Sequence, residues 1–219
     1  MNWARLLLAP ALAASIGAGG SVSAPRHGRV VSLAALERSL AGHRACTVVF
    51  DIDDTSLYST IAFVYAQGYL EETDHGAYRT DPRFWTLIND SLDQRFSRPK
   101  EIARALIAFH QQRGDTIAFV TARFPSAPAT DRTSRLLMRL FGLATPPTVI
   151  FTSQLPKTAA IRELHPALSY GDADGDIADT HAADPRIRAI RILRTPHSSN
   201  DRMPDPGKFD EEILAGSAD

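Results

Sequence analysis

Apolar runs alternate with amphipathic segments along most of the chain, and the two patterns predict different elements. Compact apolar runs predict buried strands at residues 47–50, 116–120, 148–151, 168–170 and 189–193. Apolar residues spaced three or four apart predict helices at 33–40, 99–113, 131–141 and 157–164, with one more ending near 183. Strands that alternate with helices predict an α/β fold, in which a mostly parallel sheet is covered by helices on both faces.

Two stretches interrupt this alternation. Residues 56–97 are rich in aromatic side chains but lack a strong period, which predicts a small cap-like insertion over the preceding strand end. Side chains such as Phe63 and Trp85 either pack in the core of this insertion or contact a nucleoside or aryl group of a ligand. Residues 195–219 contain three prolines and few apolar side chains, and this composition predicts an irregular C-terminal tail.

The first 24 residues have the pattern of a secretory signal peptide. Arg5 precedes a short apolar run, and residues 22–24 (Val-Ser-Ala) form a small-residue cleavage site. We therefore expect a periplasmic or secreted protein whose domain covers residues 25–219. Cys46 is the single cysteine, so an intrachain disulfide is excluded. The net charge of −1 argues against nucleic acid polymers and anionic membranes as the main partners.

Three carboxylates follow the first predicted strand within four residues, at Asp51, Asp53 and Asp54. Like charges this close repel one another, and unpaired buried charge is costly, so a cation is expected among them. Asp51 and Asp53 are two residues apart, and in extended geometry their carboxylates point to the same side. Paired carboxylates at a strand end indicate a catalytic rim.

Further chemistry follows other predicted strands. Thr121 and Asp172 come directly after strands, and Lys157 opens a predicted helix. Because ligands of parallel α/β sheets bind outside the carboxyl ends of the strands, these side chains are expected at the same rim as Asp51 and Asp53. A positive charge at a helix N-terminus opposes the helix dipole, so Lys157 is expected to have an anionic partner.

These residue types suit phosphoryl transfer. Asp51 is a usable nucleophile for phosphorus, and Asp53 is placed to donate a proton to the leaving oxygen and to activate water afterwards. Thr121 and Lys157 are expected to contact the phosphoryl oxygens. Carboxylate and carbonyl oxygens are the ligands that a hard cation such as Mg²⁺ takes, and Asp172 is a further source of them. Asp176, four residues after Asp172, is another.

The ordered set of motifs resembles the haloacid dehalogenase-like (HAD) superfamily. Its four parts are Asp51-x-Asp53-x-Thr55, Thr121, Lys157 and Gly171-Asp172-x-x-x-Asp176. The match is closer still to the class B bacterial acid phosphatases, because residues 50–55 (Phe-Asp-Ile-Asp-Asp-Thr) and 170–177 (Tyr-Gly-Asp-Ala-Asp-Gly-Asp-Ile) resemble two signatures of that family. Residues 99–104, 113–115 and 190–194 add to the resemblance, which runs from about residue 32 to the C-terminus.

The resemblance implies a Rossmann-like fold and an exported, Mg²⁺-dependent phosphatase of broad specificity. Such enzymes hydrolyse nucleotides and other phosphomonoesters, pass phosphate to alcohols and assemble as homotetramers. By the superfamily's pattern Asp51 is nucleophile and metal ligand, Asp53 is the acid/base and gives its backbone carbonyl to the metal, and Asp172 is the third protein ligand. Asp176 then supports the metal shell or Lys157.

The second motif carries the main departure from the family pattern. Residues 121–123 are Thr-Ala-Arg, so Ala122 stands where the family usually has glycine, and a slight shift of the loop is expected. The resemblance places Ala122 at the phosphate, and Arg123 is interpreted as a phosphate ligand, a loop anchor or a surface charge. The approach to Lys157, residues 152–156, is shortened, and a proline expected after Asp53 is missing.

Other functions remain open on the same scaffold. A dehalogenase is disfavoured by Asp53, since a halide leaving group needs no proton donor. A phosphomutase is disfavoured by the predicted signal peptide. A non-catalytic protein that binds phosphate or nucleotides would retain the site without turnover, and the intact pair of Asp51 and Asp53 argues against it.

Overall fold

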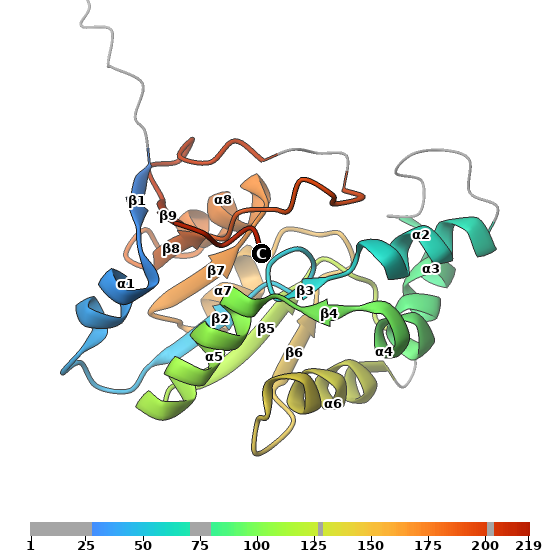
Figure 1. The fold of residues 1–219 in the computed structure, drawn as a ribbon, viewed down its shortest axis with the longest axis horizontal. Coiled ribbons are helices and arrows are strands. Elements are labelled where there is room, and N and C mark those ends of the chain that lie inside the picture. The colour runs from blue at the N-terminus through green and yellow to red at the C-terminus, as the bar shows by residue number, and fades with distance from the viewer. Residues whose placement is uncertain (1–27, 71–79, 127–128, 201–203) are drawn as a thin grey trace, which may run out of the picture.

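In a computed structural model, the chain forms a seven-stranded parallel sheet with helices on both faces (Figure 1). The structure describes residues 28–70, 80–126, 129–200 and 204–219. The predicted signal peptide, residues 1–24, lies outside the described residues, as do residues 71–79 of the predicted insertion. The α/β fold predicted from the alternation of strands and helices is confirmed.

The strands of the sheet run in the order β1-β9-β8-β7-β2-β5-β6. Their bounds are β1 (Arg29–Val31), β2 (Thr47–Phe50), β5 (Thr116–Thr121), β6 (Thr148–Phe151), β7 (Leu168–Gly171), β8 (Arg188–Arg191) and β9 (Glu212–Leu214). All neighbouring strands are parallel. The acidic segment that follows β2 therefore leaves the middle of the sheet, between β7 and β5.

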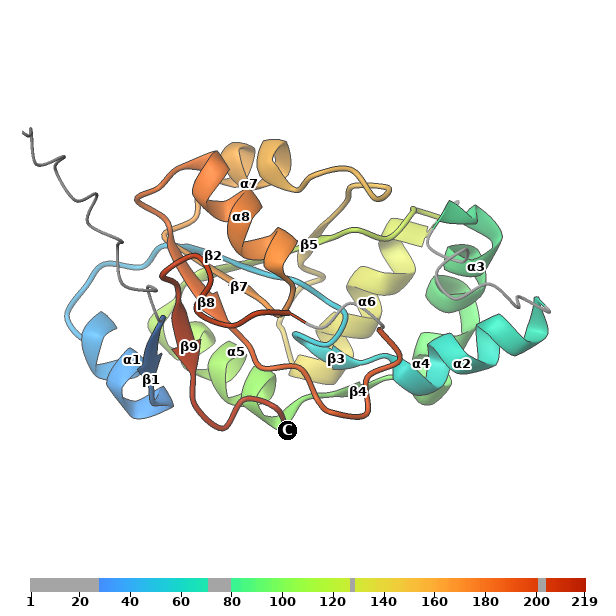
Figure 2. The same ribbon diagram turned by 90° about the horizontal axis from the view of Figure 1, so that it is seen from above.

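The helices form two layers (Figure 2). One layer contains α1 (Leu33–Leu40), α5 (Glu101–Arg113) and α6 (Ala129–Phe141), and the other contains α7 (Thr158–Leu164) and α8 (Asp174–Ala183). Ser32 caps α1 by accepting a hydrogen bond from the backbone of Ala35, and Gly114 ends α5 in the left-handed conformation. Both ends agree with the sequence-based prediction.

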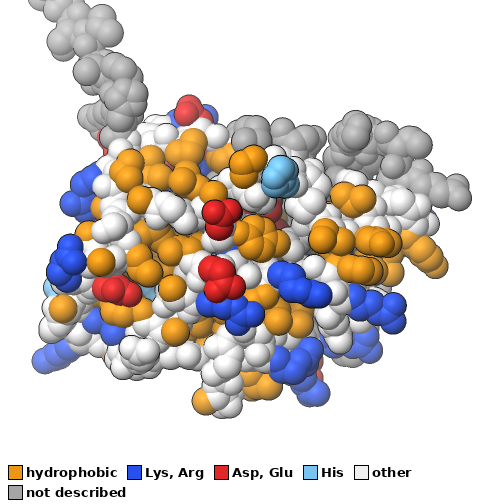
Figure 3. Space-filling model, viewed as in Figure 1, with side chains coloured by type: hydrophobic (Ala, Val, Ile, Leu, Met, Phe, Trp, Pro, Cys, Tyr) orange, Lys and Arg blue, Asp and Glu red, His pale blue; other side chains and the backbone are white. Residues whose placement is uncertain are grey.

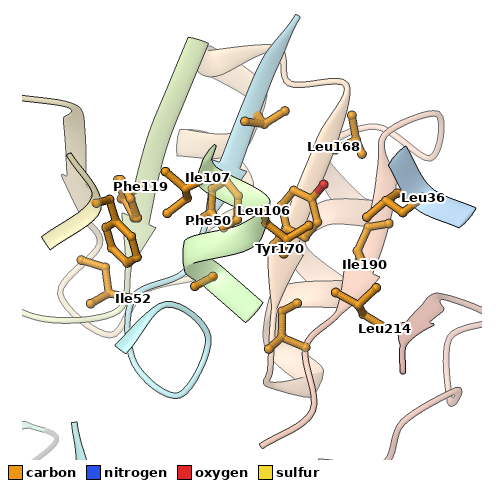
Figure 4. Close-up of a cluster of buried hydrophobic side chains, with 14 of the residues drawn as sticks. Leu36, Phe50, Ile52, Leu106, Ile107, Phe119, Leu168, Tyr170, Ile190 and Leu214 are labelled. Atoms are coloured by element: carbon orange, nitrogen blue, oxygen red, sulfur yellow. The ribbon is translucent and has the colours of Figure 1, made fainter. Parts of the chain in front are cut away.

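Side chains of the central strands are buried on both faces of the sheet. Phe50 of β2 stacks on Tyr170 of β7 with ring centroids 4.5 Å apart, and Leu106 of α5 packs in the same core (Figure 4). Val49 points to the opposite face, where it packs with Ala160 of α7. Burial on both faces explains why these strands consist of continuous apolar runs instead of alternating patterns.

A chain of buried polar groups crosses the larger core. The ring of His110 contacts the hydroxyl of Tyr170 at 2.7 Å and the carboxylate of Asp115 at 2.6 Å. Asp115 also accepts hydrogen bonds from Arg113 and from the backbone of Cys46. Burial lowers the pKa of His110, so the ring stays neutral at physiological pH. These bonds connect the end of α5 to β7, beneath the loop that carries Asp172.

The segment after β2 forms a separate lobe of short elements at one end of the molecule. They are β3 (Leu57–Tyr58), α2 (Thr60–Tyr69), α3 (Pro82–Leu87), a π-helical turn η2 (Ile88–Leu92), α4 (Asp93–Phe96) and β4 (Arg98–Pro99). β3 and β4 pair antiparallel and close the lobe at its base. Its core contains Phe63, Phe84 and Trp85, and hydrophobic side chains reach the surface at this end (Figure 3).

Two sequence-based predictions were wrong. The tail beginning at residue 195 is not irregular throughout, because β9 lies within it and inserts between β8 and β1. A three-residue strand is too short to show a period, and Leu214 is buried by partners far away in the sequence. Pro99 does not begin α5 but pairs with Leu57 in β4, and α5 begins at Glu101.

Candidate active site

The carboxyl ends of β2, β5 and β7 bring the predicted site residues together. Asp51 follows β2, Asp172 follows β7, and Lys157 lies at the N-terminus of α7. The ammonium of Lys157 donates to Asp51 and, at 2.7 Å, to Asp176. The anionic partner that the helix dipole requires for Lys157 is therefore present. All four side chains are buried.

A tight loop after β2 aims the acidic side chains. Asp54 has a φ of 59°, in the left-handed region, and its N–H donates to the carbonyl of Leu57 at 2.8 Å. The hydroxyl of Ser56 donates to the carbonyl of Asp51 at 2.6 Å. Aspartate tolerates the left-handed conformation better than most residues, which explains its use at position 54.

Three carboxylates lie close enough to share one cation. Asp51, Asp172 and Asp176 each offer an oxygen, and these oxygens lie within 4.8 Å of one another. Gly171 allows this approach, because a Cβ added there would lie 2.3 Å from the Cβ of Asp176. Asp176 also accepts a hydrogen bond from the backbone N–H of Ala173 at 3.0 Å, which closes the first turn of α8.

Asp172 is held in place by partners on both sides. Thr55 donates to one carboxylate oxygen at 2.9 Å, and Arg194 donates to the other at 2.5 and 2.7 Å. The buried guanidinium of Arg191 donates to the backbone carbonyl of Asp172 at 2.8 Å. Neither arginine was predicted from the sequence as a site residue. Both stand beside an apolar run near the exit of β8, and a positive charge next to buried apolar residues indicates a buried anionic partner.

The electrostatics of this cluster favour a bound cation. Burial raises the pKa of Asp51 well above its ordinary value, Lys157 opposes this shift, and the neighbouring carboxylates add to it. Burial likewise raises the pKa of Asp54 to about 6. Four carboxylates form ion pairs with two basic side chains, and these are Asp51, Asp54, Asp172 and Asp176 with Lys157 and Arg194. A divalent cation would offset the excess of carboxylates and keep them ionised.

Lys157 itself is fixed from two directions. Burial alone would lower the pKa of Lys157, but Asp176 and Asp51 outweigh it and raise the pKa above its ordinary value. The backbone N–H of Lys157 donates to the carboxylate of Asp179 at 2.7 Å, and the hydroxyl of Thr158 donates to the same carboxylate at 2.9 Å. The lysine is therefore a permanently charged, pre-positioned cation.

The second motif is held by the loop that precedes Lys157. Backbone N–H groups of Thr152, Ser153 and Gln154 donate in succession to the carbonyls of Thr121, Arg123 and Ala122. Ala122 has no positive φ, so alanine fits here without strain. Thr121 is buried and its hydroxyl accepts from the N–H of Arg123 at 3.3 Å. The loop that precedes Lys157 thus supports the second motif directly.

Arg123 and Asp53 form an ion pair at the edge of the rim. The Nε and Nη2 atoms of Arg123 donate to the two carboxylate oxygens of Asp53 at 2.8 and 2.6 Å, and the hydroxyl of Ser59 adds a third hydrogen bond at 2.5 Å. Of the three interpretations of Arg123, a surface charge is excluded by its full burial. Its contacts with Asp53, Asn89 and Asp93 fit a loop anchor.

The two aromatic side chains considered as ligand contacts lie inside the insertion. Phe63 and Trp85 are 5% and 4% exposed, and both pack edge to face against Phe84. The guanidinium of Arg123 lies 5.9 Å from the centre of the Trp85 ring. The structure therefore supports core packing for both side chains. The Trp85 ring also lies beside the buried guanidinium of Arg123.

Comparison with known proteins decides the family. Residues 29–200 match the model of the HAD superfamily, subfamily IIIB (acid phosphatase). The chain belongs to this family. A class B acid phosphatase of Salmonella typhi is 40% identical over 194 residues, which cover 85% of this chain and 79% of that protein. One from a Marinomonas species is 37% identical over 88% of this chain and 81% of its own length. These relatives are named class B acid phosphatases, and acid phosphatases are phosphoric monoester hydrolases.

Solved structures confirm the fold of this family member. A predicted phosphoglycolate phosphatase from Haemophilus somnus superposes with a TM-score of 0.54 at 14% identity, covering 82% of this chain and 97% of its own. A haloacid dehalogenase-like hydrolase from Bacteroides fragilis gives 0.52 at 14% identity, with coverage of 80% and 99%. Within the described residues, no helix combines the length and the hydrophobicity that crossing a bilayer requires.

Proposed function

We propose that this protein is an exported, Mg²⁺-dependent acid phosphatase that hydrolyses phosphomonoesters through an aspartyl-phosphate intermediate. The observation that carries the proposal is the meeting of Asp51, Asp172 and Asp176 beside Lys157 at the carboxyl ends of the strands. Family membership supports the same reaction, since the relatives are named class B acid phosphatases.

The donor set fits Mg²⁺. Asp51, Asp172 and the backbone carbonyl of Asp53 would hold the ion, with Asp176 close enough to complete or support the set. Oxygen ligands from carboxylates are what this hard cation prefers, and the excess of carboxylates in the cluster favours a bound cation. When bound, the ion supplies charge neutralisation between the nucleophile and the phosphate.

The proposed chemistry then follows from the chain's own residues. Asp51, whose ionised form Lys157 favours, attacks phosphorus while the bond to the leaving oxygen breaks, and Asp53 gives that oxygen a proton. Asp53 next takes a proton from water, which attacks the aspartyl phosphate and releases phosphate. Thr121, the backbone of Ala122 and Lys157 bind the phosphoryl oxygens and neutralise the charge that develops on them.

Wider features of the proposal rest on the family resemblance and on the N-terminal sequence. The substrates are nucleotides and other organic phosphomonoesters, and an alcohol that replaces water in the second step would receive the phosphate. The signal peptide at residues 1–24 delivers the protein to the periplasm or the exterior. The assembly is a homotetramer. Phe63 and Trp85 support the insertion from its core, and Arg123 contributes to the phosphate pocket through its loop.

Substitution of the nucleophile tests the proposal directly. Asp51→Asn keeps the size of the side chain but removes the attacking charge, so hydrolysis of 4-nitrophenyl phosphate with Mg²⁺ should fall by at least about 10⁴-fold. Asp131→Asn, on the exposed face of α6, serves as the matched control and should retain full activity. Full activity of Asp51→Asn would refute the nucleophile assignment. A wild-type protein that binds phosphate but hydrolyses no ester would favour the non-catalytic alternative.

A further inference from the structure

The buried guanidinium of Arg123 connects the acid/base candidate to the insertion. One edge of it donates to Asp53, as described above. The other edge belongs to Nη1, which donates to the amide oxygen of Asn89 at 3.0 Å and to the carboxylate of Asp93. Nη2 contributes a longer bond to Asp93 at 3.4 Å. The two carboxylates thus bind adjacent edges of one guanidinium and share its Nη2 atom.

The insertion is built to hold this second edge. Asn89 lies in the π-helical turn η2, and Asp93 follows directly at the start of α4. π-Helical turns are rare and recur at functional sites, because they re-aim side chains that an α-helix would direct elsewhere. The amide of Asn89 donates to the carbonyl of Phe124 at 3.0 Å, and the hydroxyl of Ser97 donates to Asp93 at 2.6 Å. Hydrogen bonds other than those to Arg123 therefore hold both side chains in place.

The burial of the three charged groups shows which of them is held and which holds it. The side chains of Arg123 and Asp93 are 0% and 1% exposed, whereas that of Asp53 is 16% exposed. The buried pair forms the fixed support, and Asp53 is the end that can reach a substrate. A proton donor must be held within hydrogen-bond reach of the leaving oxygen, so a fixed guanidinium edge determines where this carboxylate lies.

From this geometry we infer that Asp93, assisted by Asn89, is a positioning residue for proton donation by Asp53, acting through Arg123. The inference rests on the proposed phosphatase function. It assigns the insertion a direct part in the chemical step, because one of its buried carboxylates orients the proton donor of the main domain. Without the negative charge of Asp93, Arg123 loses half of its anionic support and Asp53 loses its fixed orientation.

The dependence of the rate on the leaving group separates this role from a merely structural one. The parameter kcat/KM contains the steps up to departure of the leaving group, so it reports on Asp53 as the acid. For Asp93→Asn we expect kcat/KM with an alkyl phosphomonoester to fall about 10- to 100-fold, because an alkoxide needs a proton to leave. With 4-nitrophenyl phosphate, whose leaving group is stable as an anion, we expect a loss below about threefold.

Asp90→Asn is the matched control. Asp90 lies in the same π-helical turn, but it bonds to Ser126 and Arg132 instead of Arg123. It should leave kcat/KM for both substrates close to the wild-type values. Asn89→Ser, which keeps all charges, is the second variant should Asp93→Asn fail to fold, and it should shift the two substrates in the same unequal way by a smaller factor.

The outcomes distinguish the inference from the proposed function. Unequal losses for the two leaving groups, in a variant whose circular dichroism matches wild type, support the positioning role. Equal losses, or none, for a folded Asp93→Asn or Asn89→Ser overturn it while leaving the phosphatase proposal intact. A wild-type protein that hydrolyses neither ester overturns both.

Discussion

Two glycines four residues apart provide a sharp test of how the acidic cluster is packed. Gly171 ends β7 directly before Asp172, and Gly175 lies in the first turn of α8. A Cβ added at Gly171 would lie 2.3 Å from the Cβ of Asp176 and 2.7 Å from its Oδ2, whereas one added at Gly175 has nothing within 4 Å. Gly171→Ala should therefore lower the stability of the protein, and Gly175→Ala should not.

The size of the effect follows from what Asp176 would lose. Two carbon atoms meet comfortably at about 3.5 Å, so Asp176 must move by roughly 1.2 Å. That displacement breaks its ion pair with Lys157 and its hydrogen bond to the N–H of Ala173. Losing a charge-assisted bond and a cap of this kind costs about 2–4 kcal/mol, which lowers the melting temperature by roughly 4–16 °C in a chain of this size.

Thermal unfolding and Mg²⁺ titration calorimetry measure the two consequences. Gly171→Ala should melt lower and bind Mg²⁺ about 10- to 100-fold more weakly, as expected when a group that orients metal ligands is disturbed. Gly175→Ala should melt at or up to a few degrees above the wild-type temperature, because alanine is the better helix former by about 1 kcal/mol. If Gly171→Ala matched wild type in both measurements, the close packing of Asp176 on Gly171 would be wrong.

Three further predictions concern the metal, a buried lysine and a helix cap. Removal of divalent ions with EDTA should abolish ester hydrolysis. Adding Mg²⁺ back to about 100 times its Kd should restore hydrolysis and raise the free energy of unfolding by about 2.7 kcal/mol. Unchanged activity in EDTA would contradict the metal assignment. Burial lowers the pKa of Lys100 to about 8 from 10.5, so the unfolded chain binds this proton more tightly and stability rises with pH across that interval. Urea unfolding of Lys100→Met should lack that part of the rise, and an unchanged slope would disprove it. Asp179→Ala should lower the free energy of unfolding by about 0.5–2 kcal/mol and should lower kcat, because it releases the backbone at Lys157. Asp184→Ala loses only an exposed ion pair with Arg186 and should behave like wild type. Equal melting temperatures for the two variants would argue against the cap.

Strands were the part of the fold most accessible from sequence. β2 and β6 were both predicted with their observed bounds, because each is a compact run of β-branched and aromatic residues. In the central strand β2 this run also reflects burial on both faces, whereas β6 lies at the edge of the sheet and is only partly buried. The pairing of β9 with β1 could not be predicted, since the two strands are short and about 180 residues of chain separate them. Nothing local in either segment identifies its partner.

The candidate site shows the same division. Lys157 could be matched to nearby anions because its charge opposes a helix dipole, and its contacts with Asp51 and Asp176 confirm the need for an anionic partner. The bond from Arg123 to Asp93 could not be predicted, because Asp93 lies in a stretch without a period whose π-helical turn has no recognisable sequence pattern. The catalytic roles themselves stay predictions until the variants above are measured.

The position of β9 has a consequence for how the protein is made. β9 bonds to β8 on one side and to β1, near the start of the described chain, on the other. β1 therefore cannot join the sheet until residues 212–214 have left the ribosome, and Glu211 cannot neutralise the buried guanidinium of Arg191 before then. Contacts between such distant segments form slowly. The incomplete sheet therefore keeps an open edge throughout synthesis.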